Sequence, residues 1–169
     1  MTPLLRVAVI CTGNICRSPM GEVILRELVA DDPSLAGRVV VTSAGTARWH
    51  VGKEMDPRTR NALNRAGYLS AGTLGEFASS SYLDDHDIVV VMTNEHRKDV
   101  THRLTSPDVE VIMLRDLYEV HSGLDVHDPY YGDDADFDAC LETVSRGCRT
   151  LQGLLRQRVG KLEGSPPAE

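Results

Sequence analysis

The chain alternates between short apolar runs and longer stretches in which apolar residues recur every three or four positions. The apolar runs are rich in β-branched residues and are predicted to form buried strands over residues 4–10, 38–43, 87–92 and 109–114. The amphipathic stretches are predicted to form helices over residues 19–29, 57–66, 94–104 and about 134–159. Because strands and helices alternate, the pattern predicts an α/β fold whose parallel sheet is covered on both faces.

The last predicted helix has a single apolar face. That face would carry Phe137, Leu141, Val144, Cys148, Leu151 and Leu155. The sequence then ends in Gly-Ser-Pro-Pro-Ala-Glu, which is typical of a disordered tail. With 169 residues, of which 41% are hydrophobic, the chain is long enough to bury a full core. We therefore expect one domain over residues 1–160 and a disordered tail over residues 161–169.

The strongest chemical signal lies between the first strand and the first helix, where residues 7–20 read VAVICTGNICRSPM. Cys11 ends the apolar run, Arg17 follows after five intervening residues, and Ser18-Pro19 begins the helix. In such a strand–loop–helix unit, loop N–H groups and the helix N-terminus form an anion-binding site. The helix end and the guanidinium both favour a thiolate at Cys11. The segment therefore predicts a nucleophilic thiol beneath a bound phosphate.

Arg17 separates this interpretation from a purely structural one. If Cys11 were only a buried residue at the end of a strand, Arg17 would be an ordinary charge at the start of a helix. A cation at that place opposes the helix dipole unless it holds an anion, so the structural alternative is the weaker one. The GxxxxGK pattern of nucleotide-hydrolysing loops is absent from the sequence.

Composition and charge exclude several other classes of protein. The formal net charge of −7 argues against nucleic acid or a membrane surface as a partner. Cys11 and Cys16 lie far along the chain from Cys140 and Cys148, and this usage fits a reducing cytoplasm better than a disulfide framework. Arg6 interrupts an N-terminal apolar run that is too short for a signal peptide, and no stretch is long enough to cross a membrane. We therefore expect a cytoplasmic protein.

Phosphoryl transfer to a thiolate also needs a proton donor for the departing oxygen, which an arginine cannot supply. The best candidate lies in the turn-rich sequence DVHDPYYG before the last helix. There Asp128 precedes a rigid proline, and Tyr130 and Tyr131 could shield its carboxyl group from water so that it keeps its proton. An Asp-Pro pair alone most often marks a turn, and Asp125 and Asp133 are weaker candidates that we expect to be solvated.

With the motifs CTGNICRSP and DPYYG, the chain resembles the low-molecular-weight protein tyrosine phosphatases over nearly its full length. The resemblance implies a four-stranded parallel sheet with helices on both faces, a flavodoxin- or Rossmann-like fold, and a phosphate-binding loop after the first strand. It also implies hydrolysis of phosphotyrosine through a phosphocysteine, without a metal or other cofactor. On the matching positions, Cys11 would be the nucleophile, Arg17 would bind the phosphoryl oxygens, and Asp128 would act first as general acid and then as base.

The resemblance also assigns roles to the residues around the nucleophile. Asn14 would hold the loop in its strained shape, Ser18 would hydrogen-bond the Cys11 thiolate, and Ser43 would support Asn14. The loop residues expected to bind the phosphoryl group of the substrate are Thr12, Gly13, Asn14, Ile15, Cys16 and Ser18.

Aromatic residues indicate the substrate class. A phenolic phosphate reaches a deep cysteine more easily than a short serine or threonine ester does. Trp49 follows the second predicted strand and could form, with Tyr130 and Tyr131, aromatic walls around a flat ring. The alternative is that Trp49 belongs to the core or only covers the surface. The expected partners are phosphotyrosine-bearing proteins, and phosphate or another oxyanion in the site, and we expect the protein to act as a monomer.

Several positions depart from the common pattern of the family. Gly72 stands near the place of a histidine that braces the loop, and Thr93 stands where an aspartate often follows the third strand, so we expect the bracing to be weaker or made differently. Gly21 replaces a common alanine in the first helix, at a cost of ~1 kcal/mol of helix propensity. The remaining histidines show no metal-ligand spacing and are expected to face solvent: His86, His96, His102, His121 and His127.

Cys16 has two possible roles in the same loop. It is either a small residue that fills the underside of the loop, or the partner of Cys11 in a reversible disulfide that protects the nucleophile from overoxidation.

Two rival functions remain at this point. A thioredoxin-linked arsenate reductase shares the fold and the anion loop, but its chemistry needs further cysteines near the third strand, and residues 70–100 contain none. A phosphotyrosine-binding module that has lost catalysis would not need the combination of Cys11, Arg17 and Asp128.

Overall fold

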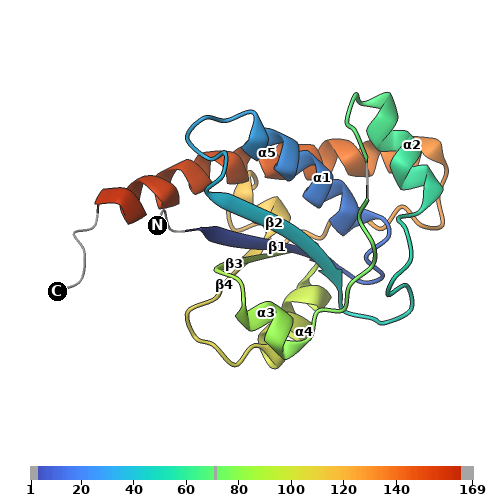
Figure 1. The fold of residues 1–169 in the computed structure, drawn as a ribbon. Coiled ribbons are helices and arrows are strands. Elements are labelled where there is room, and N and C mark those ends of the chain that lie inside the picture. Colours follow the sequence, from blue (N-terminus) through green and yellow to red (C-terminus); the bar gives the residue numbers. More distant parts are fainter. Residues whose placement is uncertain (1–3, 71, 165–169) are drawn as a thin grey trace.

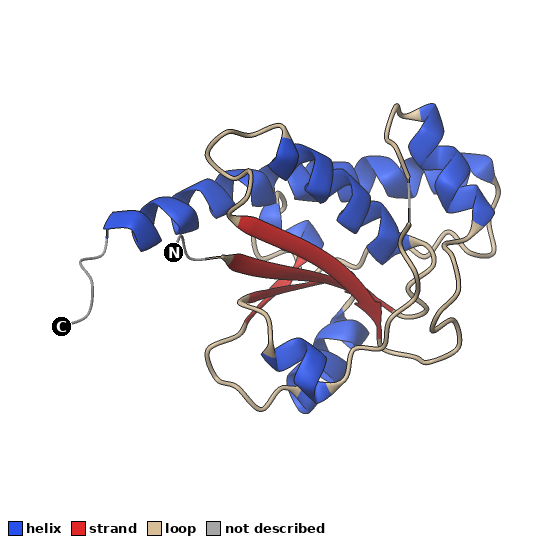
Figure 2. Cartoon of the chain, viewed as in Figure 1, coloured by secondary structure: helices blue, strands red, loops and turns tan. Residues whose placement is uncertain are grey.

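The computed structural model describes residues 4–70 and 72–164 (Figure 1). Its centre is a sheet of four strands: β1 (Leu5–Cys11), β2 (Val39–Gly45), β3 (Ile88–Val91) and β4 (Glu110–Met113). Every neighbouring pair is parallel and the strand order is β2-β1-β3-β4. Helices lie on both faces of this sheet (Figure 2), so the predicted fold is confirmed.

Two groups of helices cover the sheet. One face carries α1 (Arg17–Ala30), α2 (Pro57–Arg65) and α5 (Asp134–Gly164), and the other carries α3 (Ser80–Asp84) and α4 (Asn94–Arg103) (Figure 1). A short 3₁₀ helix, η1 (Leu114–Leu117), follows β4. Because side chains alternate along a strand, Val7 and Val9 of β1 belong to the apolar cluster under α1 and α5, whereas Ala8 and Ile10 belong to the cluster under α3 and α4.

Apart from shifts of one or two residues at the ends of other elements, the structure differs from the prediction at β2, α3 and α5. Strand β2 continues to Gly45 because it pairs with β1 as far as Cys11. Helix α3 was not predicted, because five residues are too few to show a helical period. Helix α5 continues to Gly164, so residues 161–164, predicted as part of a disordered tail, are helical. Val159 is buried near this end and Glu163 pairs with Arg38, which hold the last turns against the domain. The rest of the predicted tail lies outside the described residues.

This topology places the functional segments at one edge of the sheet. The loop after β1, the segment after β2 and the segment between η1 and α5 all meet at the carboxyl ends of the parallel strands, where α/β proteins bind their ligands. Among the helices of residues 4–70 and 72–164, none combines the length and apolar character needed to span a bilayer.

Candidate active site

The loop from Cys11 to Arg17 is held by three of its carbonyl groups, which form hydrogen bonds with neighbouring segments. The carbonyl oxygens of Cys11, Thr12 and Ile15 accept hydrogen bonds from the backbone N–H groups of residues 46, 47 and 56, at 2.9, 3.0 and 3.0 Å. A trans peptide unit directs its N–H opposite to its carbonyl, so the next N–H groups along the loop point toward the pocket. Helix α1 begins at this loop without a side-chain cap, which leaves its first N–H groups for an anion.

Asn14 fixes the strained turn of this loop. It has a φ of 57°, in the left-handed region that few residues other than glycine adopt. Its side-chain oxygen accepts a hydrogen bond from the Glu76 N–H at 3.0 Å, which leaves its Nδ2 group to donate to Ser43 Oγ at 2.9 Å and Ser18 Oγ at 2.7 Å. The buried amide therefore uses both of its ends to hold the turn.

The direction of these hydrogen bonds determines what Ser18 offers to Cys11. Ser43 donates to Glu22 Oε2 at 2.6 Å and accepts from Asn14, and Ser18 also accepts from Asn14. The Ser18 hydroxyl hydrogen therefore remains for the Cys11 Sγ atom, which lies 3.0 Å away. A hydroxyl that donates to sulfur favours the thiolate over the thiol.

Glu22 was missed by sequence reasoning. It is buried in α1 among apolar residues, and burial raises the pKa of its carboxyl group while the Ser43 hydroxyl and Arg26 act in the opposite direction. The signal in the sequence is a glutamate inside the apolar run MGEVIL, because a charged residue at a core position needs a partner.

Arg17 and Asp128 meet at the mouth of the loop. Arg17 donates through NH1 to the Val126 carbonyl at 3.1 Å and through NH2 to Asp128 Oδ2 at 3.2 Å. Its Nε group is buried and has no hydrogen-bond partner among the described residues. The guanidinium is nearly inaccessible to solvent, whereas the Asp128 side chain is 47% exposed. The arginine is thus a fixed donor, and the carboxyl group is at the open side of the site.

A pocket of about 220 Å³ opens above Cys11. Trp49, Tyr130 and Tyr131 all contribute to its walls, as do Thr12, Gly13, Ile15, Cys16 and His50. Trp49 is 71% exposed, which excludes a role in the core, and Tyr131 is 95% exposed. The side chains of Asn14, Ser18 and Ser43 are buried and do not line the pocket, so they support the loop after β1 from behind.

His96 and His86 are buried, and the prediction that they face solvent was wrong. His96 forms a hydrogen bond with Thr12 Oγ1 at 2.7 Å, which ties α4 to the loop after β1. Burial, followed by the Arg17 charge, lowers the pKa of His96 from 6.5 to about 4. His86 packs against the face of the sheet that carries α3 and α4, where it forms a hydrogen bond with Thr42 Oγ1 at 2.8 Å.

Gly72 and Thr93 are not among the described residues that brace the loop. Gly72 has a φ of 76°, and Thr93 caps α4 by accepting from the His96 N–H at 3.1 Å. The described loop supports come instead from the Glu76 N–H on Asn14 and from His96 on Thr12.

The family model described as low molecular weight phosphotyrosine protein phosphatase matches residues 6–161. The chain belongs to this family. A relative named low molecular weight protein-tyrosine-phosphatase, from Streptomyces coelicolor, is 39% identical over 159 residues, which cover 91% of this chain and 95% of the relative.

Solved structures agree with this assignment. The crystal structure of YfkJ from Bacillus subtilis is 31% identical and superposes with a TM-score of 0.81, covering 92% of this chain and 96% of YfkJ. A protein tyrosine phosphatase from Entamoeba histolytica, crystallised with Hepes in the active site, is 25% identical with a TM-score of 0.82, covering 93% of this chain and 99% of that one. The chain is a cysteine-dependent protein tyrosine phosphatase by family, and the arsenate reductase alternative has no comparable support.

Proposed function

We propose that Cys11, Arg17 and Asp128 carry the phosphatase reaction, with an aryl phosphate, above all phosphotyrosine in proteins, as the substrate. The observation that supports this most directly is the hydrogen-bond chain that leaves the Ser18 hydroxyl hydrogen for Cys11 Sγ, beneath a pocket that Arg17 and Asp128 also line. In addition, the protein is proposed to act as a monomer in a reducing cytoplasm, consistent with four free cysteines.

In the first step the Cys11 thiolate attacks phosphorus, the S–P bond forms and the P–O bond to the phenol breaks. Asp128 gives its proton to the departing phenolic oxygen. Negative charge on the phosphoryl oxygens is stabilised by the Arg17 guanidinium and by the loop N–H groups. Because the carboxyl group is at the open side and the arginine at the buried side, the acid faces the leaving group while the cation faces the phosphoryl oxygens.

In the second step water releases phosphate from the phosphocysteine. Asp128, now a carboxylate, accepts a proton from the attacking water as the O–P bond forms and the S–P bond breaks. The thiolate then leaves with the hydrogen bond from Ser18 already in place. The proton taken from that water leaves Asp128 protonated again, so the site is back in its starting protonation state.

The shape of the pocket favours a flat ring. Trp49, Tyr130 and Tyr131 stand around its mouth, and the two tyrosine rings meet edge-to-face with centroids 4.9 Å apart. A phenyl ring can span the distance from this aromatic mouth to the buried sulfur, whereas the short side chain of phosphoserine would bring its backbone into the walls.

Replacing the nucleophile and the acid tests the proposal. Cys11→Ser should abolish turnover of phenyl phosphate while vanadate still binds, because an alkoxide is not available at neutral pH. Cys148→Ser, which removes a buried thiol far from the loop, is the matched control and should keep its activity. Asp128→Asn should lower kcat/KM for phenyl phosphate by roughly 10²–10⁴-fold, and much less for 4-nitrophenyl phosphate, whose phenolate leaves without a proton.

Two results would contradict these roles. Turnover above a few per cent of wild type in Cys11→Ser would exclude Cys11 as the nucleophile. The leaving-group pattern in Asp125→Asn, rather than in Asp128→Asn, would move the acid to Asp125.

A further inference from the structure

The segment that carries Asp128 has no helix or strand of its own between η1 and α5. On the N-terminal side of Asp128 it is anchored at the buried Val126, whose N–H donates to the Met92 carbonyl at 2.8 Å and whose carbonyl accepts from Arg17. On the C-terminal side the anchor is a different arginine. Arg58 donates through NH1 to the Tyr130 carbonyl at 2.9 Å and to the Gly132 carbonyl at 3.4 Å. Asp128 lies between these two anchors.

Arg58 is itself fixed by Asp56. Its Nε and NH2 groups donate to the two carboxylate oxygens of Asp56, at 3.1 and 2.9 Å. Its guanidinium carbon also lies 4.6 Å from the centre of the Phe137 ring and 5.4 Å from that of Tyr130. The guanidinium therefore has three sets of partners, and its planar shape allows it to meet all of them in one orientation.

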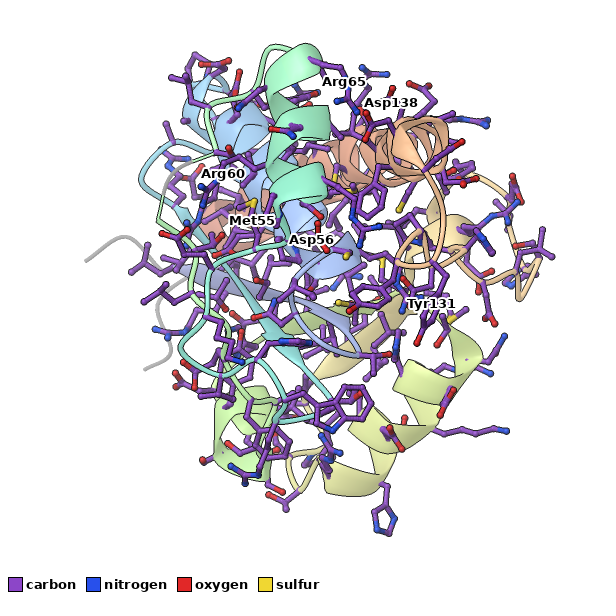
Figure 3. The ribbon with its side chains drawn as sticks, turned by 90° about the vertical axis from the view of Figure 1, so that its right-hand side faces the viewer. Met55, Asp56, Arg60, Arg65, Tyr131 and Asp138 are labelled. Carbon is purple, nitrogen blue, oxygen red and sulfur yellow. The ribbon has the colours of Figure 1, made fainter. Side chains whose placement is uncertain are left out.

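The same pair of residues is joined to the nucleophile loop. The Asp56 N–H donates to the Ile15 carbonyl at 3.0 Å, and the Asp56 carboxylate caps α2 by accepting from the Arg58 N–H at 2.8 Å. Figure 3 shows Asp56 at the start of α2, on the face of the molecule that also carries Tyr131. The path from Ile15 through Asp56 and Arg58 to Tyr130 thus joins the loop that holds Cys11 to the segment that holds Asp128.

The stability of α2 alone does not explain why an arginine stands at position 58. A cation in the first turn of a helix opposes the helix dipole, and Asp56 would cap α2 without it. The contacts that Arg58 makes beyond its own helix are with the Asp128 segment and with Phe137 at the start of α5.

We propose that Arg58, held by Asp56, is a positioning residue for the general acid: it fixes the C-terminal side of the Asp128 segment over the pocket, so that the carboxyl group reaches the leaving oxygen. This inference rests on the proposed role of Asp128. Arg58 touches neither substrate nor reacting atoms in this role, and it acts only through the backbone carbonyls of Tyr130 and Gly132.

The test measures kcat/KM for a series of aryl phosphates from 4-nitrophenyl to phenyl phosphate, since kcat/KM reports the steps up to departure of the phenol. Arg58→Met keeps the length of the side chain but removes its donors. It should lower kcat/KM for phenyl phosphate by about 10-fold or more, because small displacements of a catalytic group are costly, and leave 4-nitrophenyl phosphate much less affected. Arg58→Lys, with a point charge in place of a planar fork, should recover only part of the loss.

Arg60→Met is the matched control. Arg60 lies two residues further on in α2 and pairs with the exposed Glu54 at 2.9 Å instead of the acid segment. Its kcat/KM should stay at the wild-type value for every substrate in the series. Urea unfolding of each variant confirms that the compared proteins are folded.

A double variant separates positioning from general structural damage. If Arg58 acts through Asp128, adding Arg58→Met to Asp128→Asn should cause no further loss for phenyl phosphate. Equal losses for all leaving groups in Arg58→Met, or losses that multiply in the double variant, would overturn the proposal. If Asp128→Asn alone showed no leaving-group dependence, the acid assignment would fail and the positioning role would fail with it. If Asp128→Asn showed the leaving-group dependence and Arg58→Met did not, the positioning role would fail and the proposed function would stand.

Discussion

Four buried thiols in this protein differ in what surrounds them. Burial raises the pKa of Cys16, Cys140 and Cys148 to about 12, so each of these groups is a thiol at neutral pH. Cys11 is equally buried, but a hydroxyl donor lies 3.0 Å from its sulfur and the loop N–H groups and the start of α1 lie around it. We therefore expect reactivity to be decided by the hydrogen-bond donors at the sulfur and not by exposure of the cysteine.

The first prediction concerns oxidation of Cys11. Peroxide should convert its thiolate to a sulfenic acid, and Cys16, in the same loop, should then form a disulfide with it. Wild type should lose activity in peroxide and regain it in dithiothreitol, with a Cys11–Cys16 disulfide found by peptide mapping. Cys16→Ala should lose activity irreversibly, whereas Cys148→Ala should recover as wild type does. If Cys16→Ala regained full activity in dithiothreitol, Cys16 would serve only to fill space beneath the loop.

The second prediction concerns His96. Burial lowers the pKa of His96 from 6.5 to about 4. Between these two pH values the unfolded chain therefore binds a proton at His96 that the folded protein does not. Its contribution to the free energy of unfolding is fully present above pH 6.5 and is lost as pH falls to about 4, which amounts to roughly 3 kcal/mol. Urea unfolding at several pH values should show His96→Gln losing less stability over this range than wild type. The exposed His102 provides the control, since His102→Gln should keep the wild-type pH dependence. Identical curves for wild type and His96→Gln would contradict the assignment.

At the scale of elements, hydrophobic period predicted the four strands and the four longer helices because each buries a regular face. It did not predict α3, which has only five residues. It also could not place the partners that join distant elements. Glu22 bonds Ser43 on β2, and Arg58 bonds the carbonyl of Tyr130, although neither pair is close in the sequence. Such contacts depend on how the elements pack against one another, which a local sequence pattern does not predict.

Gly21 shows how packing overrides a preference for helix formation. From sequence, glycine at this place in α1 only lowers helix propensity, and alanine would be better. In the structure, a Cβ atom on Gly21 would lie 2.8 Å from Val9 Cγ1 on the central strand. Glycine is therefore the residue that lets α1 lie close to β1.

The third prediction follows from that contact. Gly21→Ala should lower the free energy of unfolding by about 1 kcal/mol, because overpacking of about 1–3 kcal/mol exceeds a propensity gain of about 1 kcal/mol. In a Val9→Ala background, where the opposing methyl groups are absent, the same change should be stabilising. Gly153 in α5 has open space at its Cβ position, so Gly153→Ala should stabilise by about 0.5–1 kcal/mol. Urea unfolding measures all three, and stabilisation by Gly21→Ala in the native background would contradict the prediction.

At the scale of the whole molecule, the site is assembled from segments more than a hundred residues apart. Arg17 at the start of α1 bonds the carbonyl of Val126 and the carboxylate of Asp128, and so joins the nucleophile loop to the segment before α5. The two sequence motifs predicted both segments. The net charge of −7 did not indicate an anion site, because such a site is created by local hydrogen-bond donors and not by the total charge. An anion bound there would be held by the folded protein alone, since the unfolded chain does not bring these donors together.

The last prediction measures this coupling between anion binding and folding. Inorganic phosphate at about 100 times its Kd should raise the free energy of unfolding by about 2.7 kcal/mol, which for a chain of this length is roughly 5–10 °C in Tm by calorimetry. Cys11→Ser should keep the shift because binding needs the donors and not the thiolate. Arg17→Met should lose most of it, whereas Arg65→Met, which removes an exposed pair with Asp138 on the α2–α5 side, should keep it in full. If the phosphate-induced rise in Tm persisted in Arg17→Met, phosphate would be binding at another place on the protein. The stabilisation would then not depend on Arg17 joining the two segments.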